Sequence, residues 1–99
     1  MLQIEKKIED AKACVSLEGR LDTVTAPELE KELSALIPDI MELTLDLAKL
    51  DYISSAGLRV LLSVHKIMDR KGGLKVANAG ETIMDIFEVT GFSEILDLV

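Results

Sequence analysis

The stretch LTLDLAKLDYISSAGL, from Leu43 to Leu58, holds the most informative change of pattern in this chain. Residues 43–47 alternate between apolar and polar side chains, which is typical of a β-strand with one buried face. A loop is expected next, and from Ser55 to Arg70 the apolar side chains recur with helical spacing. A strand followed directly by a helix indicates an α/β fold.

Two shorter alternating segments precede this stretch. Residues 3–7 and 12–17 predict two strands, and the polar residues 9–11 between them favour a turn, so an antiparallel hairpin is expected. Cys14 lies in the second apolar run, where we expect a small buried residue and not a reactive thiol. A single cysteine forms no internal disulfide, which fits a reducing cytoplasm.

A first helix is expected from Thr25 onward. Thr25 and Glu28 have the spacing of a capping box, and Pro27 falls in the first turn, where no backbone donor is needed. The following apolar residues have helical spacing, and Pro38 predicts the end of the helix.

The C-terminal half continues the alternation of helices and strands. Gly72 and Gly73 predict the end of the helix that starts at Ser55, residues 74–77 predict a strand, and residues 82–90 predict a third helix. Residues 95–99 suit either a short edge strand or a terminal helical turn. We therefore expect one α/β domain over residues 1–99, with an N-terminal antiparallel hairpin followed by parallel strands joined by helices.

Composition narrows the classes of partner. The net charge of −7, without a basic stripe that carries aromatic residues, argues against nucleic acid. No apolar run approaches the roughly 18 residues needed to cross a bilayer, and the N-terminal residues lack the pattern of a signal peptide. We expect a cytoplasmic protein with no membrane and no nucleic-acid partner.

Loops that leave the carboxyl ends of parallel strands share one edge of a sheet, where such folds commonly bind ligands. Three loops qualify: one with Asp22 and Thr23, one with Ser54 and Ser55, and one with Asn78. The sequence predicts that these side chains meet at one rim.

The residues expected at this rim do not form a catalyst. His65 is the only histidine and falls in mid-helix, so neither a Ser-His-Asp triad nor a zinc site is expected. No glycine-rich phosphate loop is present either. We predict that the chain is not an enzyme and uses no cofactor and no metal; a small enzyme or nucleotide binder at this rim is the competing class.

Two interpretations of the adjacent serines follow from their residue types. Ser54 or Ser55 can cap the helix, since a hydroxyl accepts a hydrogen bond from a free backbone N–H. The N-terminus of a helix also tolerates a phosphate, because its free N–H groups and dipole favour an anion. A phosphorylated Ser55 therefore suits a reversible binding switch.

Nearly the whole chain resembles the STAS domains, and more closely the stand-alone bacterial anti-sigma factor antagonists. The resemblance rests on the order of five short motifs: Gly19-Arg20-Leu21-Asp22 with Thr25, Leu45-Asp46-Leu47, Tyr52-Ile53-Ser54-Ser55-Ala56-Gly57-Leu58, Gly73-Leu74-Lys75-Val76, and Ile86-Phe87 with Gly91-Phe92.

The resemblance implies a phosphorylation cycle. In such proteins an anti-sigma factor that is itself a serine kinase binds the unphosphorylated antagonist, which frees a sigma factor, and then phosphorylates the serine that corresponds to Ser55. A serine phosphatase reverses the modification. Asp22 matches an aspartate that orients the partner, and Thr25 matches a cap position.

The motif departs from the Asp-Ser-Ser-Gly of many phosphorylated members. Here it reads Ser54-Ser55-Ala56-Gly57, so Ser54 is the second choice of acceptor. The expected partner surface comprises Asp22, Thr23, Ser54, Ser55, Gly57, Leu58 and Asn78. We expect a monomer when no partner is bound, and a STAS interaction or scaffold subunit without phosphorylation is the alternative function.

Overall fold

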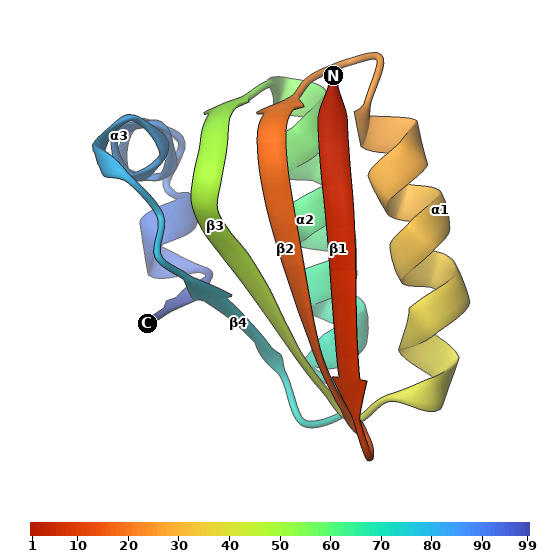
Figure 1. The fold of residues 1–99 in the computed structure, drawn as a ribbon. Helices are drawn as coiled ribbons and strands as arrows, with labels where there is room; N and C mark the ends of the chain where they lie inside the picture. The colour runs from red at the N-terminus through yellow and green to blue at the C-terminus, as the bar shows by residue number, and fades with distance from the viewer.

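The computed structural model describes residues 1–99 and contains five strands, three α-helices and two 3₁₀ turns (Figure 1). In chain order the elements are β1 Leu2–Glu9, β2 Lys12–Leu21, α1 Ala26–Leu36, a 3₁₀ turn Ile37–Asp39, β3 Glu42–Ile53, α2 Ser55–Met68, β4 Leu74–Ala77, α3 Glu81–Thr90, a 3₁₀ turn Phe92–Glu94 and β5 Asp97–Leu98.

The strands form one sheet in the order β1-β2-β3-β4-β5. β1 and β2 pair antiparallel, whereas the other three pairs are parallel. The predicted mixed α/β sheet is therefore confirmed. Of the two possibilities left for the C-terminal residues, the short edge strand is the one observed.

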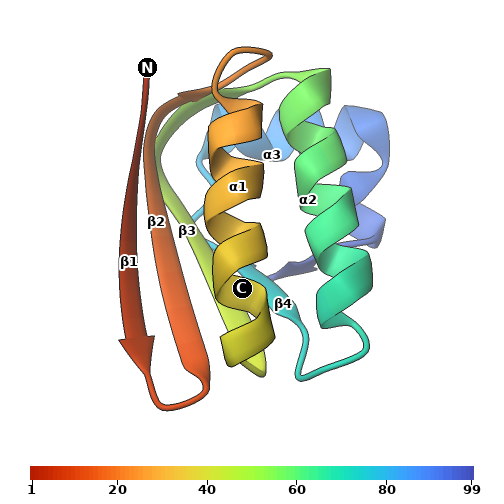
Figure 2. The ribbon, with the colours of Figure 1, turned by 90° about the vertical axis from the view of Figure 1, so that its right-hand side faces the viewer.

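Helices α1 and α2 cover one face of the sheet (Figure 2). Ala13, Val15 and Leu17 of β2 point into this layer and are buried. Cys14 is half-buried on the opposite, uncovered face, which we call the open face. The prediction of a buried core cysteine is wrong, because the alternation of β2 directs Ala13 and Val15 inward and Cys14 outward.

Helix α1 begins without the predicted capping box. Thr25 precedes it with helical backbone angles and makes no side-chain capping bond to the helix. The N–H of Ala26 instead donates to the carbonyl oxygen of Asp22 at 2.8 Å. The capping box is wrong because the Thr25 hydroxyl is occupied by backbone groups on the N-terminal side of the helix. Pro27 lies in the first turn as expected.

Strand β3 is longer than its alternating segment predicts. Asp51 to Ile53 belong to the strand, where a loop is expected from the sequence. Pairing with β2 shifts twice along the way, so that β3 carries an extra residue at each shift. At the first shift Ala48 and Lys49 are both exposed, which breaks the strict alternation.

No helix of the structure is both long enough and apolar enough to span a bilayer. Helix α3 packs beside the part of β3 that extends beyond β4 (Figure 1). That extension brings the carboxyl ends of β2 and β3 together, well away from the end of β4.

Candidate functional site

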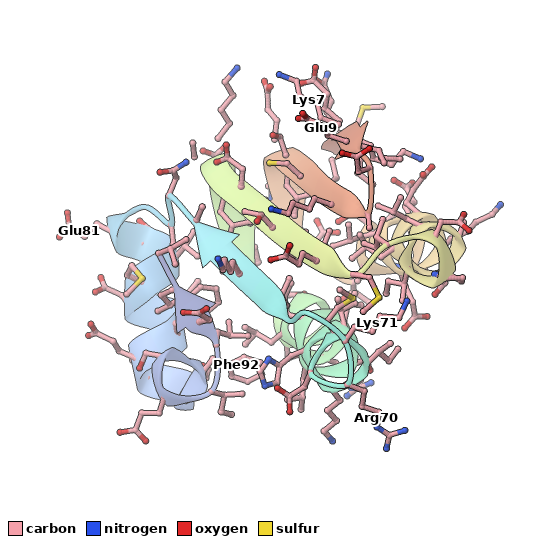
Figure 3. All side chains as sticks on the ribbon, turned by 90° about the horizontal axis from the view of Figure 1, so that it is seen from below. Lys7, Glu9, Arg70, Lys71, Glu81 and Phe92 are labelled. Carbon is pink, nitrogen blue, oxygen red and sulfur yellow. The ribbon has the colours of Figure 1, made fainter.

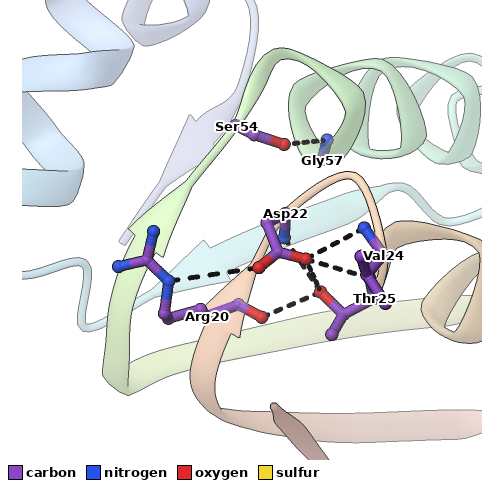
Figure 4. A network of polar contacts seen from close by, with 6 residues as sticks. All are labelled: Arg20, Asp22, Val24, Thr25, Ser54 and Gly57. Carbon is purple, nitrogen blue, oxygen red and sulfur yellow. Dashed lines mark hydrogen bonds and ion pairs between the residues drawn. The ribbon is translucent and has the colours of Figure 1, made fainter.

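The candidate site is the rim where β2 passes into α1 and β3 passes into α2 (Figure 4). The N–H of Ser54 donates to the carbonyl oxygen of Leu21 at 2.8 Å. Asp22 and Ser55 are the residues that follow this bonded pair in the two segments. The structure therefore brings together the first two of the three predicted loops.

The Asp22 carboxylate organises the first loop. Its Oδ1 accepts hydrogen bonds from the N–H groups of Val24 at 3.0 Å and Thr25 at 3.1 Å. The hydrogen bond from the Thr25 N–H is the main cause that lowers the pKa of Asp22 below its ordinary value of 3.8. The second oxygen, Oδ2, lies 4.0 Å from Nε of Arg20. Asp22 is thus held ionised, with one oxygen engaged in the loop.

Thr25 holds the base of the same loop. Its side chain is 4% exposed, and its hydroxyl accepts from the N–H of Asp22 and donates to the carbonyl oxygen of Arg20, both at 2.8 Å. These contacts lie on one buried side of the rim. Thr25 is therefore a positioning residue that fixes where the Asp22 carboxylate stands.

The two serines have different environments. Ser54 is half-buried and is the N-cap of α2, where its Oγ accepts from the N–H of Gly57 at 3.4 Å. Ser55 is the first residue of the helix, and its side chain is exposed. The capping interpretation thus applies to Ser54, whereas the Ser55 hydroxyl faces solvent.

Gly57 and Leu58 lie on the inner side of α2. A Cβ built on Gly57 would stand 2.7 Å from Cγ of Leu21 and 3.1 Å from Cγ2 of Ile53, so only glycine permits this close approach. Leu58 is 7% exposed and belongs to the core. Both residues position the rim from beneath, whereas we had expected them on the partner surface.

Asn78 lies away from this rim. The last register pair between β3 and β4 is Asp46 with Ala77, so Asn78 stands beside Asp46, and its Nδ2 donates to Asp46 Oδ1 at 3.1 Å. Ile53, at the rim, is seven residues farther along β3, roughly 20 Å away. The prediction that all three loops meet is wrong for Asn78, because β3 extends beyond β4.

Three further residues complete the rim. The guanidinium of Arg20 lies over the ring of Tyr52, 4.4 Å from its centroid, where β2 and β3 are in register. Val24 is 78% exposed at the tip of the Asp22 loop, next to the exposed Thr23. An apolar residue between two threonines was the sequence signal for Val24; the Arg20 contact depends on a register that the sequence pattern does not show.

The rim offers a carboxylate, hydroxyls, a guanidinium and an apolar tip, which is a set suited to binding. No group of three or more histidine, cysteine, aspartate or glutamate side chains is placed to hold a metal ion. His65 is half-buried in mid-helix, as expected, and its Nδ1 has no hydrogen-bond partner. Neither feature lies at the rim.

Comparisons with known proteins agree with this geometry. The family model described as STAS domain matches residues 3–99. The chain is 38% identical to the putative anti-sigma factor antagonist BtrV of Bordetella bronchiseptica over 87% of this chain and 76% of that protein. It is 29% identical to the anti-sigma-B factor antagonist of Bacillus subtilis, over 98% of this chain and 90% of that protein.

Structural similarity points the same way. The crystal structure of an anti-sigma factor antagonist from Mycobacterium paratuberculosis superposes with a TM-score of 0.90 and 26% identity, covering 99% of this chain and 85% of that one. These relatives are named for antagonism of a regulatory protein and not for catalysis. The comparisons therefore support the prediction that the chain is a regulatory binding protein and not an enzyme.

Proposed function

This chain belongs to the STAS domain family, and we propose that it is an anti-sigma factor antagonist controlled by phosphorylation of Ser55. In its unphosphorylated form it binds an anti-sigma factor that is also a serine kinase, and this binding frees a sigma factor. Phosphorylation ends the binding, and a serine phosphatase restores it. The observation that carries the proposal is the exposed Ser55 at the start of α2, beside the Asp22 loop.

The surroundings favour Ser55 over Ser54 as the acceptor. Transfer of a phosphoryl group requires that the hydroxyl reach the active site of another protein. The Ser54 oxygen caps α2 and is half-buried, so its modification would remove a helix cap. Ser55 is free of that role and is exposed.

A phosphate on Ser55 is compatible with the fold. The first turn of α2 contains no acidic residue that would repel it, and the helix dipole favours an anion there. Arg59, exposed and four residues later, lies on the same side of the helix within reach of the phosphate. Phosphorylation therefore changes the partner surface and leaves the core in place.

The charge of the modified surface explains release of the partner. A phosphate moves the net charge of the protein from −7 to about −9, and the added charge lies where the partner must dock. The phosphate also fills space in front of Ser55. Together these effects weaken the complex with a kinase whose own phosphate-binding site is occupied by nucleotide.

The test compares affinity-tagged wild-type protein, Ser55→Ala, Ser55→Asp and Ser63→Asp in the cells of origin. Ser63 is exposed on α2 away from the rim, so its variant adds the same charge elsewhere. We expect wild type, Ser55→Ala and Ser63→Asp to capture a serine-kinase anti-sigma factor, and Ser55→Asp to lose it.

Equal capture by Ser55→Asp would contradict the switch and favour a constitutive STAS scaffold subunit. Capture of no anti-sigma factor by any of the variants would contradict the proposed function as a whole. The proposal for Asp22 and Thr23 as partner contacts is tested in the same assay with Thr23→Ala, which removes an exposed hydroxyl from the loop tip.

A further inference from the structure

The outer edge of β1 is a long strand edge without a neighbour. β1 is the terminal strand of the sheet, runs for eight residues and contains neither proline nor a bulge, which are the features that commonly protect such edges. The opposite edge, β5, has only two residues. β1 is thus the one edge of this sheet that offers a full strand for pairing.

The backbone direction of β1 follows from its pairing with β2. The N–H of Arg20 donates to the carbonyl oxygen of Met1, so the backbone groups of Met1 face β2. Antiparallel pairing continues without a shift to Glu9. Because these directions alternate along a strand, the N–H and C=O groups of Leu2, Ile4, Lys6 and Ile8 point outward. We call this row of backbone groups the β1 edge.

The side chains alternate in the same rhythm. Ile4, Lys6 and Ile8 lie on the face covered by helices, where Lys6 forms an ion pair with Glu32 of α1. Glu5 and Lys7 lie on the open face, and Figure 3 shows Lys7 on the side of the sheet away from α1 and α2. Ile8 is 58% exposed, a large apolar side chain at the margin of the sheet.

We propose that two copies of this chain pair their β1 edges antiparallel about a two-fold axis at Lys6, so that the two sheets become continuous. In this register Ile4 lies opposite Ile8 of the second copy, and Glu5 lies opposite Lys7 of the second copy. The symmetry produces each pair twice. Glu5 and Lys7 would form non-hydrogen-bonded pairs, in which side chains of opposite strands approach closely.

Charge selects this register over its neighbours. A shift of two residues in one direction places Glu5 opposite the second Glu5, and a shift in the other direction places Lys7 opposite the second Lys7. A shift of one residue would pair outward backbone groups with inward ones. The two Lys6 side chains become neighbours at the axis, where each is already neutralised by its own Glu32.

The arrangement leaves the Ser55 rim free. β2 leads to the rim and runs antiparallel to β1, so the β2 strands of the two copies run in opposite directions. The two rims then lie at opposite ends of the joined sheet. The pairing differs from the monomer expected from the sequence, and it does not depend on the proposed function.

The test is sedimentation equilibrium of the purified chain up to about 1 mM, since a short strand edge is expected to associate weakly. We expect a reversible monomer–dimer equilibrium. Glu5→Lys places like charges opposite each other twice and should raise the dissociation constant about ten-fold. Glu5→Lys combined with Lys7→Glu restores both opposite-charge pairs and should restore dimerisation.

Ile8→Pro provides a second, uncharged test. Its N–H points outward, so proline there removes no bond to β2 and is tolerated on an edge strand. We expect a monomer with the circular dichroism spectrum of the wild type. A wild-type chain that is monomeric at about 1 mM overturns the proposal. So does a dimer that neither the charge variants nor Ile8→Pro weaken.

Discussion

Substitution of Gly57 by alanine tests how closely α2 must approach the strand ends to hold the rim. The new Cβ would lie 2.7 Å from Cγ and 3.0 Å from Cδ2 of Leu21. Carbon atoms at optimal separation lie about 3.5–4.0 Å apart, so the overlap is close to 1 Å. Leu21 is fully buried and Ile53 is 2% exposed, which leaves neither side chain space to retreat.

Two opposing effects set the size of the change. An extra methyl group in a packed core costs about 1–3 kcal/mol in the free energy of unfolding. Alanine gains at most about 1 kcal/mol over glycine in a helix, and less in the first turn, where Gly57 lies. We expect a net destabilisation of about 1–2 kcal/mol, which lowers the Tm of a domain of this size by roughly 4–15 °C.

Thermal and urea unfolding, followed by circular dichroism, measure this change. Gly80→Ala is the control, because a Cβ on Gly80 meets no atom within 4 Å and its backbone angles suit alanine. We expect the control to lower the free energy of unfolding by about 0.5 kcal/mol at most, the cost of alanine at an N-cap. A Gly57→Ala protein that melts at or above the wild-type Tm would refute the role assigned to Gly57.

Three further outcomes follow from the rim. Thr25→Val should lower the free energy of unfolding by about 1–3 kcal/mol in urea titrations, because it leaves the N–H of Asp22 and the C=O of Arg20 without partners, and Thr25→Ser should recover most of the loss. Asp22→Ala should lower the Tm at pH 7. Because the pKa of Asp22 is depressed in the folded state, its contribution is present above about pH 4 and is lost at lower pH, so the Tm gap between variant and wild type should narrow between pH 5 and pH 3; a gap that widens would contradict this. Ser55→Asp should match or exceed the wild-type Tm, since an acidic residue at the first position of α2 gains about 0.3–1 kcal/mol from the helix dipole, and a clear loss of stability would argue against a phosphate there.

Local patterns were sufficient to predict most of the elements. The alternation in residues 3–7 and 12–17 located the hairpin, and β4 has the bounds 74–77 that the sequence indicated. Each of these predictions depends on contacts that one short segment makes with a single buried layer. The fold class followed because helices between successive strands require parallel pairing.

What the sequence could not predict depends on register. Ala48 and Lys49 interrupt the alternation of β3 with two exposed residues, so the strand seemed to end near Leu47 when it continues to Ile53. That hidden extension separates Asn78 from the rim. Bulges arise from pairing with another strand, so a pattern read along one segment does not show them.

The site shows the same division. Asp22, Ser54 and Ser55 were placed correctly at one rim, because both parent strands end there. The capping box failed because the Thr25 hydroxyl finds nearer partners in the loop before the helix. Gly57 and Leu58 were assigned to the partner surface from their position in a motif, whereas packing against Leu21 places them beneath it.

The most direct test of the account is peptide mass spectrometry of this protein recovered from its own cells under two growth conditions. A peptide that spans Asp51 to Arg59 distinguishes phosphate on Ser55 from phosphate on Ser54. We predict phosphate on Ser55, in a fraction that changes between the two conditions. Full coverage of this peptide without phosphate in either condition, or with phosphate on Ser54 alone, would contradict a switch at Ser55.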